Sequence, residues 1–341
     1  MAYDVVVVGA GPGGLECARV LAEGGKSVLL IDRKEIIGPK VCAGGLTLEN
    51  FGFGIPKHLL RGEFPVQYIH TPAGTSRVVF EKPVVSTISR HDLGQWQLSE
   101  AKKSGAEVME GIAVTEIRDK SLIADGKEIF FGHLVGSDGA GSIVRRHLGI
   151  PVQNLIMAIQ YIVPRRFDSM EWFFDDRLFS LGYGWIFPHG DYASIGCGCE
   201  SRFMPTAKLR ENFHAWLADR NIDVSGAKYE GHPISYDYRG HRFGNKFLVG
   251  DAGGFTSGLT GEGIYFALVS GHEVAKMILD EKYYPEDLHR LLAVKREQEK
   301  ILNFLKPWGS FRNAWFSLFT YYLNVFFRHP IKLNEERPIE A

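Results

Sequence analysis

Cysteine is scarce in this chain of 341 residues, which contains only Cys17, Cys42, Cys197 and Cys199. Four scattered cysteines exclude a disulfide framework, and the absence of a Cys-x-x-Cys pair gives no indication of a zinc site. We therefore expect no bound metal ion. Cys197 and Cys199 are expected to lie on one strand and to face the same side as small core residues, because free cysteine is usually buried.

The sequence also lacks an excess of either charge, because 39 Lys and Arg balance 40 Asp and Glu. Without a basic field, no nucleic-acid partner is expected. The contents of 45% hydrophobic and 23% charged residues exclude disordered, fibrous and many-span membrane proteins. The first residues lack the charged leader and apolar run of a secretory signal, so we expect a cytoplasmic protein.

A glycine-rich motif follows a β-branched run near the start of the chain. Residues 5–8 predict a buried strand, residues 14–23 a helix and residues 27–31 a second strand. The motif G-x-G-x-x-G between them lets a pyrophosphate approach the backbone at the helix N-terminus. An acidic residue about 20 residues downstream can accept hydrogen bonds from a ribose. The predicted dinucleotide contacts are Gly9, Gly11, Pro12, Gly13, Gly14, Asp32 and Arg33.

Two later segments each end a predicted strand in a turn that contains aspartate and glycine. These are residues 133–142 and residues 247–254, the latter followed by a glycine-rich helix start at residues 260–264. Together with the first motif, they resemble the three-motif set of the FAD-dependent, aromatic-hydroxylase-like flavoprotein superfamily. The resemblance implies that the cofactor is FAD, and that the helix beginning near Gly261 favours negative charge on the reduced flavin. The further FAD contacts that we predict are Arg90, Asp138, Gly139, Asp251, Gly261, Gly263 and Ile264.

Two shorter stretches narrow the resemblance to one family. Residues 42–45 look like the C-x-G-G loop of the geranylgeranyl reductase family, and residues 183–188 look like its Y-x-W-x-F-P substrate motif. On spacing alone, the aromatic residues of the second stretch are equally typical of a core face. The resemblance implies FAD contacts from Cys42, Ala43 and Gly44, and substrate contacts from Gly44, Gly45, Tyr183, Trp185 and Phe187. Cys42 and Tyr183 are the candidate catalytic residues.

The pattern of elements predicts an α/β fold with a Rossmann-like FAD-binding domain, an inserted antiparallel-sheet substrate domain and a C-terminal helical segment. The FAD-binding domain is expected to comprise residues 1–62, 84–150 and 240–282. The substrate domain is expected to comprise residues 63–83 and 151–239, followed by the helical segment at residues 283–341. The predicted domains are therefore discontinuous in sequence.

The resemblance implies a reductase that saturates carbon–carbon double bonds of an isoprenoid lipid of the geranylgeranyl type. Reduced FAD would deliver a hydride to one alkene carbon while a proton reaches the other. The electron donor is expected to be NADPH or a ferredoxin-like carrier, because no second nicotinamide motif is visible. An aromatic monooxygenase on the same scaffold and a quinone-linked electron-transfer flavoprotein stay open as alternatives. The halogenase motif W-x-W-x-I-P differs from residues 183–188 at two signature positions.

The C-terminal part contains an uncharged, aromatic-rich run at residues 313–327, bracketed by Arg312 and Arg328. This run is shorter than the about 20 residues that span a bilayer, so it favours an interfacial helix or a lid over an anchor. Packing into the protein core stays open. A peripheral contact at the inner face of the membrane follows from the interfacial interpretation. The polar stripe predicted on this helix consists of Ser310, Asn313, Ser317, Thr320 and Asn324.

Overall fold

The computed structural model describes residues 1–326 and divides into two compact units, each assembled from separate stretches of the chain. The first unit contains Met1–Lys40, Arg90–Leu155 and Ile234–Glu299. The second unit contains Val41–Ser89, Ile156–Pro233 and the described residues from Lys300 onward. The assignment of FAD to one unit and substrate to the other stays a prediction.

The first unit is built on an eight-stranded sheet in the order β17-β18-β11-β1-β2-β8, with β10 pairing β11 and β9 pairing β10. Strand β1 runs parallel to β11 and β2, as the predicted strand–helix–strand start requires. The strands are β1 (Ala2–Val8), β2 (Val28–Asp32), β8 (Glu107–Glu110), β9 (Val114–Ile117), β10 (Ser121–Ala124), β11 (Lys127–Gly136), β17 (Arg242–Phe243) and β18 (Lys246–Leu248).

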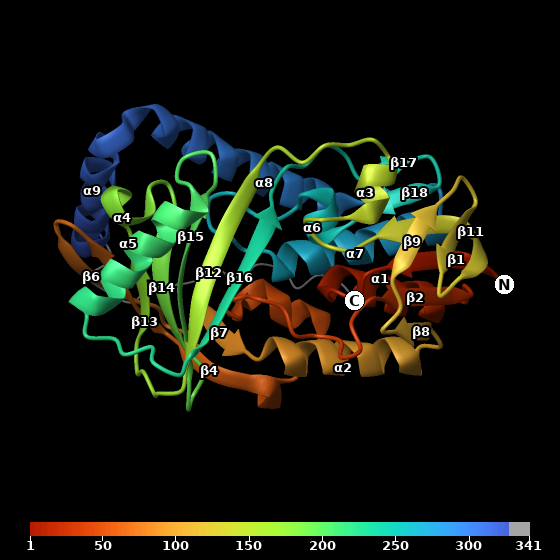
Figure 1. Cartoon of the computed structure of the whole chain (residues 1–341), viewed down its shortest axis with the longest axis horizontal. Helices are drawn as coiled ribbons and strands as arrows, with labels where there is room; N and C mark the ends of the chain where they lie inside the picture. The colour runs from red at the N-terminus through yellow and green to blue at the C-terminus, as the bar shows by residue number, and fades with distance from the viewer. Residues whose placement is uncertain (327–341) are drawn as a thin grey trace. The chain divides into compact units, whose positions relative to one another are not determined.

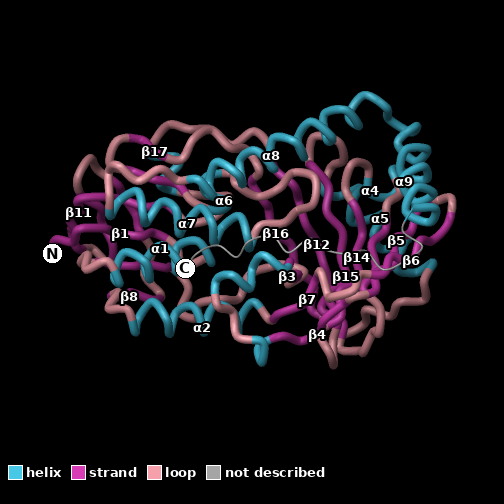
Figure 2. Tube along the Cα trace, turned by 180° about the vertical axis from the view of Figure 1, so that it is seen from behind, coloured by secondary structure: helices cyan, strands magenta, loops and turns pink. Residues whose placement is uncertain are grey.

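Both faces of this sheet are covered, which explains why strand β1 is apolar without interruption. Val5 and Val7 join one core cluster, whereas Val6 and Val8 join a second cluster on the other face. The helices of the unit are α1 (Pro12–Glu23), α2 (Arg90–Lys103), α3 (Ile143–His147), α6 (Gly250–Gly253), α7 (Ile264–Leu279) and α8 (Glu286–Leu305), whose end enters the second unit. Helices α1 and α7 lie side by side, as Figures 1 and 2 show, and make the most extensive helix contact. The predicted Rossmann-like fold is confirmed.

The second unit contains a seven-stranded sheet in the order β16-β12-β15-β14-β13-β5-β6. The pairs β12–β15, β15–β14, β14–β13 and β5–β6 are antiparallel, whereas β13 runs parallel to β5. A small sheet of β3, β7 and β4 accompanies it. The strands are β3 (Gly45–Thr47), β4 (Leu60–Phe64), β5 (Val66–Thr71), β6 (Gly74–Val79), β7 (Val85–Ile88), β12 (Leu155–Val163), β13 (Met170–Phe173), β14 (Tyr183–Pro188), β15 (Ala193–Glu200) and β16 (Lys228–Ser235). The predicted, mostly antiparallel sheet is thereby confirmed.

Helices cover one face and one edge of the large sheet. The helices of this unit are α4 (Asp176–Phe179), α5 (Thr206–Asp219), α9 (Arg312–Phe326), and the short 3-10 helices η1 (Leu48–Phe53), η2 (Lys57–Leu59) and η3 (Lys306–Phe311). Cys197 and Cys199 both lie on β15 and belong to one core cluster, as predicted, and this cluster also contains residues of α5. Helix α9 packs along β5 and β6. Within residues 1–326, no helix is both long enough and apolar enough to cross a membrane.

Candidate functional site

The glycine-rich loop of the first unit is tightly packed at two of its three motif glycines. Gly9 has φ +102°, and a Cβ atom there would lie 2.4 Å from the carbonyl oxygen of Ser137. A Cβ atom on Gly14 would lie 2.1 Å from the carbonyl oxygen of Gly9. These two glycines are therefore required by the fold itself, since neither position has space for a side chain.

Gly11 differs from both neighbours in the motif. Its φ is −75°, which any residue adopts, and a Cβ atom there would meet nothing closer than Ser137, 3.6 Å away. Gly11 is also the N-cap of α1, with no side-chain cap and no acidic residue in the first helical turn. The fold does not explain a glycine at this position, whereas the approach of a phosphate to an uncapped helix N-terminus does.

Asp32 is fixed beside this loop at the end of β2. Its Oδ2 atom accepts a hydrogen bond of 2.7 Å from the backbone N–H of Ala10, and its Oδ1 atom accepts one of 2.8 Å from Lys34. Both oxygen atoms of the carboxylate are thus oriented by backbone N–H groups. Arg33 is exposed, and its role stays a prediction.

Asp251 lies at the N-terminus of helix α7, although it is located on α6. Its Oδ1 atom accepts a hydrogen bond of 2.7 Å from the Thr256 hydroxyl, and its Oδ2 atom forms an ion pair of 2.8 Å with Lys40. Gly263 is the N-cap of α7, and a Cβ atom there would lie 3.7 Å from Asp251 Oδ1. The chain therefore places a carboxylate, a cation and an uncapped helix start together, as a polar cofactor requires.

Lys40 and Thr256 are functional candidates that the sequence did not identify. Lys40 lies two positions before Cys42 of the predicted C-x-G-G loop, and Thr256 lies between Asp251 and the glycines of the α7 start. Only the position of Lys40 beside a recognised motif could have indicated it. Gly261 has φ +70°, a backbone conformation that favours glycine, so the turn itself also requires a glycine at this position.

Asp138 has a local structural role in addition to its predicted one. Its Oδ2 atom accepts a hydrogen bond of 2.6 Å from the backbone N–H of Ile143, near the start of α3. Burial raises the pKa of this carboxyl group. In the described part of the chain, Arg90 Nε and Asp138 Oδ1 are buried without a hydrogen-bond partner. The Arg90 N–H donor fits an anionic cofactor group. Gly139, which follows Asp138, has φ +78° and shapes the turn.

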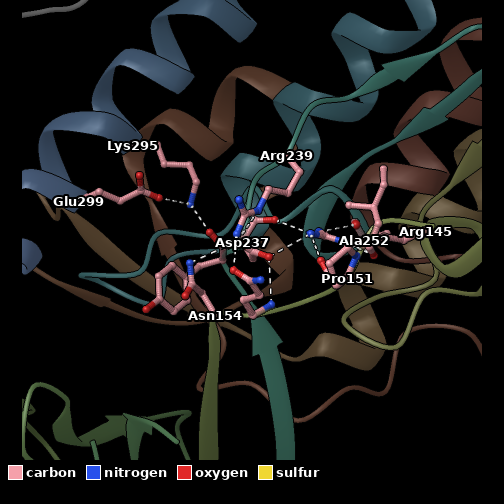
Figure 3. Close-up of polar contacts among 11 residues, drawn as sticks. Arg145, Pro151, Asn154, Asp237, Arg239, Ala252, Lys295 and Glu299 are labelled. Atoms are coloured by element: carbon pink, nitrogen blue, oxygen red, sulfur yellow. Dashed lines mark hydrogen bonds and ion pairs between the residues drawn. The ribbon is translucent and has the colours of Figure 1, made fainter. Parts of the chain in front are cut away.

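A network of buried charged side chains links the backbone segments around helix α6, which carries Asp251 (Figure 3). The Arg145 guanidinium is 1% exposed and donates to the carbonyl oxygens of Ala252, Pro151 and Asp237, and it pairs with the Asp237 carboxylate at 3.2 Å. Lys295, whose pKa is lowered by burial, donates to two further backbone carbonyl groups. This network fixes the backbone that carries Asp251.

Replacing Arg145 with methionine is expected to lower the free energy of unfolding by about 3 kcal/mol, because Asp237 would lose a buried partner. Urea denaturation followed by circular dichroism measures this change. The control is Arg118→Met, since Arg118 forms only exposed ion pairs and its removal should leave the unfolding midpoint unchanged. Equal midpoints for the two variants would contradict a stabilising role for the network.

In the second unit, the two stretches that resemble the reductase family lie against each other. Gly44 has φ +76°, and a Cβ atom there would lie 2.5 Å from the Ile88 carbonyl oxygen and 2.7 Å from the His189 ring. The backbone N–H of Gly44 donates to the half-buried Cys42 sulfur at 3.4 Å. A Cβ atom on Gly45 would lie 2.9 Å from the Phe187 ring. The loop at residues 42–45 thus packs against the end of β14.

The aromatic residues of β14 face away from the core cluster that contains α5. Ile186 belongs to that cluster, and the strand alternation places Tyr183, Trp185 and Phe187 on the other face. Trp172 on β13 contacts this face, with its ring centroid 5.4 Å from Tyr183 and 4.7 Å from Phe187. The three rings therefore form a continuous aromatic wall, with Tyr183 the least buried of them.

Trp185 also has a polar contact that the sequence pattern did not indicate. Its indole N–H donates to the Ser194 hydroxyl at 2.9 Å, and that hydroxyl donates to Gln160. The ring is 6% exposed, so it is a packed part of the sheet as well as a candidate substrate contact. Trp185 can therefore be both a packed core residue and a part of the aromatic wall.

The sequence is similar to those of several known proteins. The model of the Thi4 family matches residues 1–120. The chain is 31% identical over 303 residues to a geranylgeranyl diphosphate reductase from Rhodobacter capsulatus, covering 81% of this chain and 75% of the relative. It is 28% identical over 330 residues to a digeranylgeranylglycerophospholipid reductase from Methanocaldococcus jannaschii, covering 89% and 84% of the two chains.

Solved structures agree with the fold. A geranylgeranyl bacteriochlorophyll reductase-like protein from Thermoplasma acidophilum superposes with a TM-score of 0.73 at 20% identity, covering 95% of this chain and 88% of the other. A halogenase in complex with FAD superposes with a TM-score of 0.68 at 17% identity, covering 94% and 83%. At these identities, the structures establish the architecture alone.

Proposed function

Because this chain belongs to the geranylgeranyl reductase family of FAD-dependent oxidoreductases, we propose that it saturates carbon–carbon double bonds of an isoprenoid lipid. The observation that carries the proposal is the packing of the loop at residues 42–45 against the aromatic strand β14. Both segments match the family pattern, and they come together from distant parts of the chain. The finer choice of substrate and electron donor rests on the experiments below.

FAD is proposed to bind the first unit through the α1 loop, Asp32 and the group around Asp251. Gly11 supports this assignment, because a glycine there serves no purpose in the packing of the chain. Arg90 supports it as well, because its buried Nε would gain an acceptor. When bound and reduced, FAD supplies a hydride. Lys40 and Thr256 fix the Asp251 carboxylate, and the positive end of α7 favours nearby negative charge.

The second unit is proposed to contact the prenyl chain and to supply the proton. Aromatic rings suit a prenyl chain because they bury apolar area without demanding hydrogen bonds. Cys42 and Tyr183 both carry an exchangeable proton and are both half-buried. An isolated alkene accepts hydride poorly, so a well-placed proton donor and a dry site are required. The electron donor is proposed to be NADPH or a ferredoxin-like carrier.

The test is an anaerobic assay of the chemically reduced enzyme with geranylgeranyl diphosphate and with a digeranylgeranylglycerophospholipid. Mass spectrometry is expected to detect two added hydrogen atoms per reduced double bond. In a parallel aerobic assay with NADPH and a phenol, oxygenated products with oxygen-dependent NADPH oxidation would instead establish an aromatic monooxygenase. Reduction of a quinone without any change in either prenyl compound would establish the electron-transfer alternative.

A peripheral contact with a lipid bilayer is proposed for helix α9. The polar stripe on this helix faces inward, because Asn313 exchanges hydrogen bonds with Asp175 and Asp176, and Thr320 contacts β5 and β6. The side chains of Ser310 and Asn324 lie outside the described residues. The outward surface is apolar, because Leu318 on α9 is 55% exposed and Phe311, the last residue of η3, is 71% exposed.

Helix α9 therefore differs from an ordinary surface helix, which packs its apolar face against the core and exposes its polar face to solvent. Arg312 is buried and pairs with Asp176, so no charge from it reaches the outward face. A cluster of Phe304, Trp308 and Trp315 continues the aromatic surface towards α8. Aromatic side chains of this kind suit the interface between lipid headgroups and acyl chains. The helix is thus proposed to rest on the membrane that holds the substrate.

A further inference from the structure

His189 directly follows strand β14 and is buried against the loop at residues 42–45. Its Nε2 atom lies 2.9 Å from the carbonyl oxygen of Ala43, and its side chain is 3% exposed. A carbonyl oxygen can only accept, so Nε2 carries the hydrogen atom. The ring stacks on Tyr192 with centroids 4.7 Å apart and planes 7° apart. The imidazole is therefore held in one orientation.

The bonded carbonyl group belongs to the residue between Cys42 and Gly44. A Cβ atom on Gly44 would lie 2.7 Å from the His189 Cε1 atom, so the ring fills the space beside this glycine. The Gly44 N–H in turn donates to the Cys42 sulfur. The His189 ring thus contacts the Ala43 carbonyl group and lies beside Gly44, whose N–H group holds the Cys42 thiol.

Burial lowers the pKa of His189, and the nearby Arg61 shifts it in the same direction. The ring is consequently neutral near pH 7, with Nε2 as the donor and Nδ1 as the acceptor. Within the described residues, Nδ1 has no hydrogen-bond partner and is buried. A buried acceptor without a partner costs free energy, so the presence of this imidazole calls for a compensating role.

We propose that His189 is a positioning residue, which holds the Cys42 loop packed against the end of β14 through the Ala43 carbonyl group, so that the thiol is kept in place and partly shielded. The inference rests on the proposed function for its catalytic meaning. The role of His189 in holding the loop can be tested independently, because the reactivity of the Cys42 thiol can be measured without a prenyl substrate. The two family-like segments are then linked by a hydrogen bond as well as by packing.

The test compares His189→Gln, which keeps an N–H donor, with His189→Phe, which keeps a ring beside Tyr192 but has no donor. The rate of Cys42 alkylation by iodoacetamide is measured on the purified protein by mass spectrometry. Cys17, Cys197 and Cys199 are buried and serve as internal controls. We expect the phenylalanine variant to react about five- to tenfold faster, as the loss of one hydrogen bond implies, and the glutamine variant to stay within about twofold of the parent.

A second readout connects the loop to turnover. The phenylalanine variant is expected to lower kcat for prenyl reduction with KM nearly unchanged, and the glutamine variant to restore it. If the phenylalanine variant does not fold, His189→Met provides another side chain without a donor. Equal alkylation rates in all folded variants, or a raised rate in the glutamine variant, would overturn the positioning role. Failure of the prenyl assay with the expected alkylation pattern would instead overturn only the proposed substrate.

Discussion

Replacing Gly11 with alanine is expected to abolish FAD binding and to leave the fold intact. The new methyl group would lie 3.6 Å from Ser137, an ordinary contact, and the φ of −75° suits any residue. It would, however, occupy the space in which a pyrophosphate must approach the backbone. We expect at least about a hundredfold weaker binding, equivalent to about 2.8 kcal/mol. Flavin absorbance of the purified protein and titration of the apoprotein with FAD measure the loss.

Two glycine variants serve as controls for this effect. Gly14→Ala would place a Cβ atom 2.1 Å from the Gly9 carbonyl oxygen, so it should damage the fold and lower the melting temperature. Gly52→Ala meets no atom within 4 Å and should change neither folding nor FAD content. A folded Gly11→Ala protein that retains flavin would falsify the assignment of the pyrophosphate to this loop.

The first unit could be predicted well because its signals are local. Four consecutive valines at residues 5–8 indicate a strand buried on both faces, and the structure distributes them over two core clusters. The glycine motif then marks the start of α1. The cofactor contacts assigned to these motifs stay predictions, although the geometry of Gly11 supports them.

The contacts of Lys40 and of His189 could not be predicted, because each joins residues that are distant in sequence within its own unit. Lys40 and Asp251 are separated by 211 positions, and Ala43 and His189 by 146. Neither pair has a spacing rule, since the chain crosses between the two units before each contact forms. Propensity and periodicity act over a few turns or strands. Only the family-like motifs indicated that such distant segments belong together.

Helix α9 shows a different limit of sequence interpretation. The spacing of Asn313, Ser317 and Thr320 predicts a polar stripe on a helix, but periodicity cannot determine which face points inward. The stripe faces the rest of the second unit because Asp175, Asp176 and the β5–β6 hairpin offer it polar partners. The apolar residues are consequently left on the surface. An assumption that apolar faces always point inward would have assigned this helix to the core.

Replacing Phe311, Leu318 and Phe319 together with glutamine is expected to remove most of the association with lipid vesicles. Each of these side chains is about half exposed or more, at 71%, 55% and 48%. Full burial of one large apolar side chain contributes about 1.5 to 3 kcal/mol. Partial insertion of three should therefore account for at least about a tenfold difference in partitioning. Cosedimentation with vesicles measures it, while FAD content and the melting temperature should stay unchanged.

The control is Tyr284→Gln, because Tyr284 is 68% exposed and lies outside α9 and η3. This variant should bind vesicles as strongly as the parent, because replacing an exposed aromatic residue elsewhere on the surface should not weaken vesicle binding. A substitution on the inward face, Thr320→Val, should lower the melting temperature instead, because the Thr320 hydroxyl donates to the Thr71 hydroxyl at 3.1 Å and valine removes that bond. If the triple variant binds vesicles as strongly as the parent, the outward face of α9 does not contact lipid. A parent protein that does not bind vesicles would lead to the same conclusion, and the apolar face would then require a protein partner.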